Sequence, residues 1–91
     1  MPALDLDRAW DLHPRVSVRP EPFGALLYHF GTRRLSFLKD RTLLAVVQSL
    51  AEHPTVRAAC TSVGIDDAAL PRYERALATL AQSSMVVERT P

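Results

Sequence analysis

The chain has 91 residues, of which 47% are apolar, and its formal net charge is +1. This length accommodates one domain, and the apolar content is typical of a globular protein, which argues against a disordered or multidomain chain. The weak charge gives no field that would attract nucleic acid or a membrane surface. The single cysteine, Cys60, excludes an intramolecular disulfide.

The N-terminus is acidic and lacks the apolar run of a signal peptide. No stretch reaches the ~20 apolar residues that span a bilayer, so we expect a cytoplasmic protein. Residues 1–13 are predicted to be an extension ahead of the main domain, residues 14–88. Two interpretations of the extension are open: it docks through Trp10, or it is a disordered end.

The first half of the domain predicts a three-stranded antiparallel meander. Residues 15–19 (RVSVR) alternate and are bracketed by prolines, which cannot donate to a sheet ladder. Residues 25–30 (ALLYHF) alternate between two glycines that punctuate turns. A short loop, residues 31–33, makes residues 34–38 (RLSFL) an antiparallel partner. We expect Leu35 and Phe37 to share a face.

The second half changes to helical spacing. Asp40 is a good N-cap for a helix that runs to about residue 52 and ends before a proline. Thr55 can cap a short second helix that stops at Gly64. A third helix is predicted from near Pro71, which suits a first turn, and residues 85–88 suggest a last strand. The predicted buried stripe of the third helix consists of Leu70, Tyr73, Leu77 and Leu80. The fold class is therefore α+β, with an N-terminal three-stranded meander followed by a three-helix bundle.

No constellation of residues indicates catalysis. The histidines, His13, His29 and His53, lack the spacing of a zinc site on one element. Cys60 lies on an apolar helix face without a flanking base, which favours an inert buried thiol. A Gly-rich phosphate loop is absent from the sequence. We expect neither an enzyme nor a bound cofactor or metal.

The strand edges are more informative. Residues 15–19 are blunted by prolines, whereas residues 34–38 contain neither proline nor glycine and would offer unpaired backbone groups. Either another extended chain pairs with this edge, or the N-terminal extension, the chain end or a second copy in a homodimer covers it. Arginines around the edge and on the third helix would suit an acidic peptide with apolar anchors. The candidate peptide-binding residues are Arg33, Arg34, Leu35, Ser36, Phe37, Leu38, Arg72, Tyr73, Arg75, Ala76 and Leu77.

The alternative is a small winged-helix transcriptional regulator whose third helix enters the major groove of DNA. Two observations count against it. A winged helix usually carries its hairpin after the recognition helix, and here only seven residues follow Ser84. The polar face of the third helix offers Arg72 and Arg75, offset by Glu74, which is a weak basic surface for DNA.

Several motifs resemble the PqqD-like family of peptide-recognition elements, which act in the synthesis of ribosomally made, modified peptides. They are the LLY strand, the short hairpin, the D-x-T opening at residues 40–42 and the TV opening at residues 55–56. HPRV at 13–16 and RPEPFGALLYHFGTRRLSFL at 19–38 resemble the branch of this family that serves mycofactocin biosynthesis. The resemblance covers about residues 14–88; its PEPFGALLY block is fairly specific and its helical half generic.

The resemblance implies a winged helix-turn-helix-like fold and a non-catalytic peptide chaperone. It implies that the leader of an MftA-like precursor peptide adds as a strand to residues 34–38, against the helix at residues 71–82. It also implies delivery to an MftC-like radical S-adenosylmethionine maturase, which holds the iron–sulfur clusters. Pro71 departs from the family pattern and would shorten the third helix.

Overall fold

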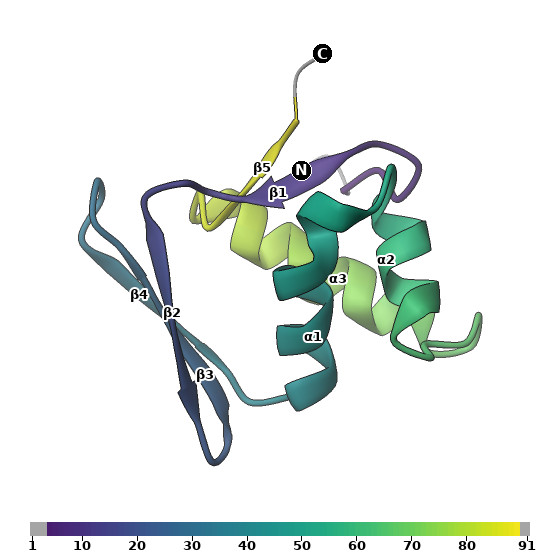
Figure 1. The fold of residues 1–91 in the computed structure, drawn as a ribbon, viewed down its shortest axis with the longest axis horizontal. Coiled ribbons are helices and arrows are strands. Elements are labelled where there is room, and N and C mark those ends of the chain that lie inside the picture. The colour runs from purple at the N-terminus through teal and green to yellow at the C-terminus, as the bar shows by residue number, and fades with distance from the viewer. Residues whose placement is uncertain (1–3, 90–91) are drawn as a thin grey trace.

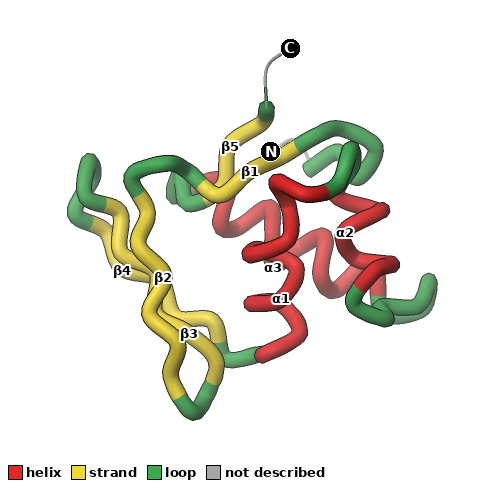
Figure 2. Tube along the Cα trace, viewed as in Figure 1, coloured by secondary structure: helices red, strands yellow, loops and turns green. Residues whose placement is uncertain are grey.

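The computed structural model describes residues 4–89 and has an α+β fold. A three-stranded sheet lies on one side of the molecule and the helices on the other, with a second, two-stranded sheet across one end of the helices (Figures 1 and 2). Within residues 4–89, no helix combines the length and the hydropathy that a membrane span requires. The strands are β1 (Trp10–Leu12), β2 (Val16–Glu21), β3 (Gly24–His29), β4 (Arg34–Leu38) and β5 (Val86–Glu88). The helices are α1 (Arg41–Ser49), a 3₁₀ turn η1 (Leu50–Glu52), α2 (Val56–Ser62) and α3 (Leu70–Gln82).

The predicted meander is present as the antiparallel sheet β2-β3-β4, but its first two strands differ from the prediction at both ends. The first strand continues through Pro20 to Glu21 instead of ending at residue 19, since an edge strand tolerates proline. The second strand ends at His29, and Phe30 lies in the turn. The reason is local: the His29 Nδ1 accepts hydrogen bonds from the amides of Gly31 and Thr32, which closes the turn one residue early.

The two faces of this sheet differ completely. On the inner face, Ala25, Leu27 and Leu38 are buried against the helical layer, and α1 packs on β3 and β4. The opposite, outer face carries Leu35 and Phe37 and is open to solvent. The two residues predicted to share a face do so, and that face is not the core.

Helices α1 and α2 begin where their predicted caps place them. Asp40 accepts hydrogen bonds from the amides of Thr42 and Leu43, and Thr55 accepts one from Ala58. The last turn before residue 53 is a 3₁₀ turn and not α-helix. The whole predicted stripe of α3 is buried. Pro71 occupies the first turn of α3, where its missing N–H leaves no bond unmade, so it does not shorten the helix.

Residues 4–12 are not a disordered end. Leu4 and Leu6 are buried in the core, and β1 pairs with β5 in antiparallel register. The sequence indicated the short last strand but not its partner. The predicted fold is corrected here: the meander is not the N-terminal element of the structure, because β1 precedes it. Residues 1–3 of the predicted extension lie outside the described residues.

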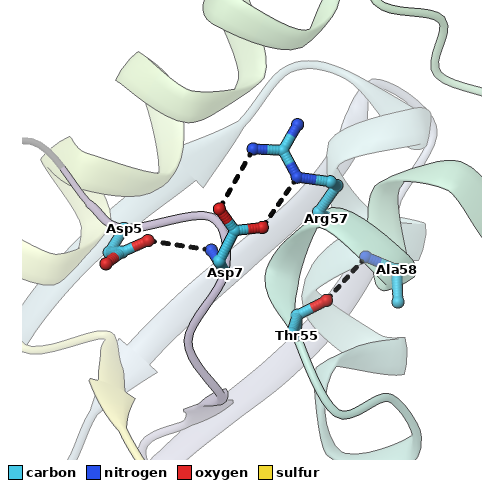
Figure 3. A network of polar contacts seen from close by, with 5 residues as sticks. All are labelled: Asp5, Asp7, Thr55, Arg57 and Ala58. Carbon is cyan, nitrogen blue, oxygen red and sulfur yellow. Dashed lines mark hydrogen bonds and ion pairs between the residues drawn. The ribbon is translucent and has the colours of Figure 1, made fainter.

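The N-terminal segment is fastened to the start of α2. The carbonyls of Leu6 and Arg8 accept hydrogen bonds from the amides of Arg57 and Val56, two donors that a helix start leaves without intrahelical partners. Asp7 forms an ion pair with the Arg57 guanidinium at 2.8 Å, as Figure 3 shows. The segment therefore caps α2 while its leucines extend the core.

Candidate functional site

The open edge of β4 is defined by the hydrogen-bond pattern of the sheet. The amide of Phe30 donates to the carbonyl of Arg15 at 2.9 Å, which makes that pair a hydrogen-bonded one. Antiparallel pairs alternate, so the backbone groups of residues 25, 27 and 29 point to β4, and those of residues 34, 36 and 38 point back to β3. The N–H and C=O groups of Leu35 and Phe37 are therefore directed away from the sheet, to its free edge.

A hollow of about 310 Å³ lies between β4 and α3. This β4–α3 hollow is lined by Ser36, Phe37, Leu38, Leu43, Ala76, Thr79 and Leu80. Its lining is largely apolar, and it begins at the strand whose edge is open. A chain that added to β4 would place one row of its side chains toward this hollow, because side chains alternate along a strand.

The structure brings together four of the predicted site residues: Ser36, Phe37, Leu38 and Ala76 all line the hollow. Tyr73 and Leu77, predicted as groove walls, are buried in the core and do not line it. Leu35, another predicted site residue, has its side chain on the outer face of the sheet, because Leu35 pairs with Tyr28 and paired residues share a face.

Three lining residues, Leu43, Thr79 and Leu80, were missed by the sequence prediction. The helical period placed Leu80 on the same stripe as Tyr73. Both side chains are equally buried, at 6% exposed, so the period could not show which of them borders β4.

The basic rim is partly engaged within the protein. The Arg72 guanidinium donates to the Tyr73 hydroxyl at 2.9 Å and lies 3.7 Å from Asp40. Arg41 donates to the carbonyl of Pro22. Arg33, Arg34 and Arg75 are exposed. Of the predicted cations, these three are the better placed to meet an acidic ligand.

Asp40 links the end of β4 to both α1 and α3. Besides capping α1, its carboxylate accepts a hydrogen bond from the Tyr73 hydroxyl at 2.9 Å. Desolvation of Asp40 acts to raise its pKa, but the hydrogen bonds from Tyr73 and from the α1 amides, with the nearby Arg72 charge, together lower it. The carboxylate thus stays ionised and holds the two walls of the hollow in place.

The titratable side chains singled out in the sequence have structural surroundings. The His29 Nδ1 is occupied by two turn amides, and the His13 ring lies 4.3 Å from the His29 ring, centroid to centroid. Burial raises the pKa of the Cys60 thiol, which disfavours the reactive thiolate. Within residues 4–89, no group of three or more His, Cys, Asp or Glu side chains could hold a metal ion.

An open strand edge beside an apolar hollow is the arrangement by which sheet proteins bind extended peptides. Comparison with known proteins agrees: the chain belongs to the peptide chaperone MftB family, whose family model matches residues 9–87. The resemblance noted in the sequence is thereby confirmed. The comparisons give no support to the DNA-binding alternative.

Three curated relatives each carry the name peptide chaperone MftB. That of Mycobacterium tuberculosis is 64% identical over 86 residues, which cover 94% of this chain and 79% of the relative. That of Mycobacterium ulcerans is 65% identical, covering 93% and 78%. That of Mycolicibacterium smegmatis is 56% identical, covering 97% and 86%. No solved structure matches the chain.

Proposed function

We propose that this peptide chaperone of mycofactocin biosynthesis binds the leader of an MftA-like precursor peptide as an added strand on β4. The observation that carries the proposal is the juxtaposition of the free β4 edge with the β4–α3 hollow. The peptide would pair with the outward backbone groups of Leu35 and Phe37. Its apolar side chains would enter the hollow between Phe37 and Ala76.

Estimates of the binding free energy explain why the peptide needs both the β4 edge and the hollow. Two residues that each direct an N–H and a C=O to the edge allow about four hydrogen bonds, worth roughly 0.5–1.5 kcal/mol each. Micromolar affinity requires about 8 kcal/mol after the entropy of association is met. Backbone pairing alone falls short, so apolar side chains in the hollow must supply the difference.

The exposed arginines favour a leader with carboxylates near its anchors. Arg33 and Arg34 lie at one end of β4, and Arg75 lies on the exposed side of α3. Rim charges of this kind mainly raise the rate of association and select among peptides.

The role proposed for the chain is presentation and not catalysis. The family name describes a chaperone, and the chemistry would belong to an MftC-like radical S-adenosylmethionine maturase that receives the peptide. No cofactor is assigned to this chain.

A matched pair of substitutions tests the peptide site. Thr79 on α3 lines the hollow, whereas Thr61 is exposed on α2 and lies outside it. Thr79→Glu should weaken binding of the synthetic precursor peptide about tenfold or more, because the new carboxylate lies in an apolar hollow and repels an acidic peptide. Isothermal titration calorimetry measures the affinity. Thr61→Glu should leave the affinity within about twofold. Equal affinities of the two variants would refute a site at the hollow.

A further inference from the structure

The outer face of the β2-β3-β4 sheet carries a continuous set of exposed apolar side chains. Phe37 lies opposite Leu26, and Leu35 lies opposite Tyr28. The Phe23 ring lies 6.3 Å from the Phe37 ring, and the Phe30 ring packs edge-on against Tyr28 at 4.9 Å. We call this set the outer apolar face; it consists of Phe23, Leu26, Tyr28, Phe30, Leu35 and Phe37.

Four large side chains on this face are each about half exposed. The exposed fractions are 45% for Phe23, 57% for Phe30, 54% for Leu35 and 61% for Phe37. Since an aromatic side chain can bury 150–250 Å², the face presents on the order of 400 Å² of apolar surface. Patches of this size on a monomer are often functional, and Phe and Tyr are enriched in protein interfaces.

The charge around the face is mostly positive. Between residues 16 and 39 the basic side chains are Arg19, Arg33, Arg34 and Lys39, and Glu21 is the sole acidic one. Arg19 lies beside Leu26 on the outer face, and its guanidinium is 3.0 Å from the Glu21 carboxylate. Arg34 lies on the inner side of the sheet, opposite His29. Arg33 and Lys39, which flank β4, leave the rim positive, which fits a partner surface edged with carboxylates.

The face is also continuous with the edge of β4. A strand that added to β4 would extend the sheet, and alternate side chains of that strand would join the outer apolar face. Phe37 belongs to both regions, since it lies on this face and lines the hollow. A protein docked on the face would therefore contact the chaperone and its bound peptide together.

We propose that the outer apolar face docks a folded protein whose contact patch is apolar and edged with carboxylates. This rests on the proposed function: the partner is the maturase that takes over the peptide. A face of this size suits a weak, exchanging complex, which a delivery protein requires.

Two other occupants are less suited to the face. A second copy would bring two rims of the same positive sign together across a two-fold axis, which like charges disfavour. An anionic membrane generally needs a cluster of about four to eight cations. The outer face offers fewer, because Arg34 lies on the inner side of the sheet and Arg19 is paired with Glu21.

The test uses the double variant Tyr28→Thr/Phe30→Glu. Both residues lie on β3 or its following turn, away from the β4–α3 hollow, and Thr keeps a strand-forming residue on β3. Thr61→Glu is the control for added charge. Binding to the purified MftC-like maturase and to the synthetic precursor peptide is measured separately by fluorescence anisotropy, after circular dichroism has established the fold.

The proposal predicts that the double variant binds the maturase at least about tenfold more weakly than the wild type, while its peptide affinity stays within about twofold. An unchanged maturase affinity overturns it. Loss of binding to vesicles of 30% phosphatidylserine, or conversion of a wild-type dimer to a monomer, with maturase binding intact also overturns it. A wild-type chain that fails to bind the peptide refutes the proposed function instead.

Discussion

The two edge strands of the meander, β2 and β4, belong to the same sheet, but they differ in how many outward amides can pair with another chain. The backbone groups of residues 16, 18 and 20 point outward from β2, by the same alternation that directs those of Leu35 and Phe37 outward from β4. On β2, the Val16 amide already donates to the carbonyl of His13, and Pro20 has no N–H. Val18 alone remains to donate from that edge, whereas β4 keeps both amides.

The difference shows how a small protein can open one edge without inviting aggregation on the other. Proline at an edge position removes a donor at little cost to the sheet, because the lost N–H would have faced solvent. The open edge is the one beside a hollow, so pairing there gains side-chain contacts as well. Availability and selectivity therefore coincide on β4.

The largest effect is expected from substituting Gly24, because the substitution disrupts the sheet and with it both edges. Its φ is +147°, and an added Cβ would lie 2.1 Å from the carbonyl oxygen of Leu38. Gly24→Ala should therefore lower the free energy of unfolding by more than about 3 kcal/mol, measured by urea denaturation. Gly64→Ala is the control, since nothing lies within 4 Å of its added Cβ and only its φ of +88° is strained. Similar losses in both variants would contradict the close packing at Gly24.

A second pair of substitutions compares the two edges directly. Leu35→Pro removes an outward amide from β4, and Val18→Pro removes the last outward amide from β2. Leu35→Pro should weaken peptide binding about tenfold or more, whereas Val18→Pro should change it less than about threefold. Calorimetric titration of each folded variant with the precursor peptide measures the ratio. A greater loss from Val18→Pro would assign the peptide to the wrong edge.

Acid should loosen the wall of the hollow through Asp40. Its folded-state pKa lies below the ordinary 3.8, so its contribution to stability is present above 3.8 and is lost as the pH falls through the lowered value. Tyr73→Phe removes one hydrogen bond to this carboxylate and should cost about 1 kcal/mol at neutral pH. Urea denaturation across this pH range should show a smaller acid loss in the variant. An identical pH dependence would exclude the Tyr73 bond as a cause of the shift.

The smallest effect is expected from reopening the blunted edge. Pro20→Val restores one outward amide to β2, next to the free Val18 amide. Sedimentation velocity should then show more concentration-dependent association than in the wild type. Association no greater than that of the wild type would mean that Pro20 does not protect this edge.

Much of the fold could be predicted because its signals are local. Asp40 and Thr55 announced two helix starts, and the helical stripe of α3 was correct at every position. The pairing of β1 with β5 could not be predicted, because it joins the two ends of the domain and each strand has only 3 residues, too few to establish a period. The alternation of the sequence predicts that Phe30 belongs to the strand. In the structure the His29 ring closes the turn at that point, and periodicity does not encode such a contact.

The candidate site was predictable in its strand and less so in its helix. The absence of proline and glycine from residues 34–38 is visible in the sequence, and it marks the open edge. Which side of α3 meets β4 depends on the packing angle, which the sequence does not reveal. The prediction therefore names Tyr73 and Leu77, whereas Thr79 and Leu80 line the hollow. The outer apolar face follows from the same register, once the inner face is known.

Hydrogen exchange of individual backbone amides decides whether the peptide adds as a strand to β4. The amides of Leu35, Phe37 and Val18 would be followed by NMR, with and without the precursor peptide. We expect the peptide to slow exchange at Leu35 and Phe37 and to leave Val18 unchanged, because only the β4 edge gains a neighbouring strand. Protection at Val18, or binding without protection at either β4 amide, would contradict strand addition at β4.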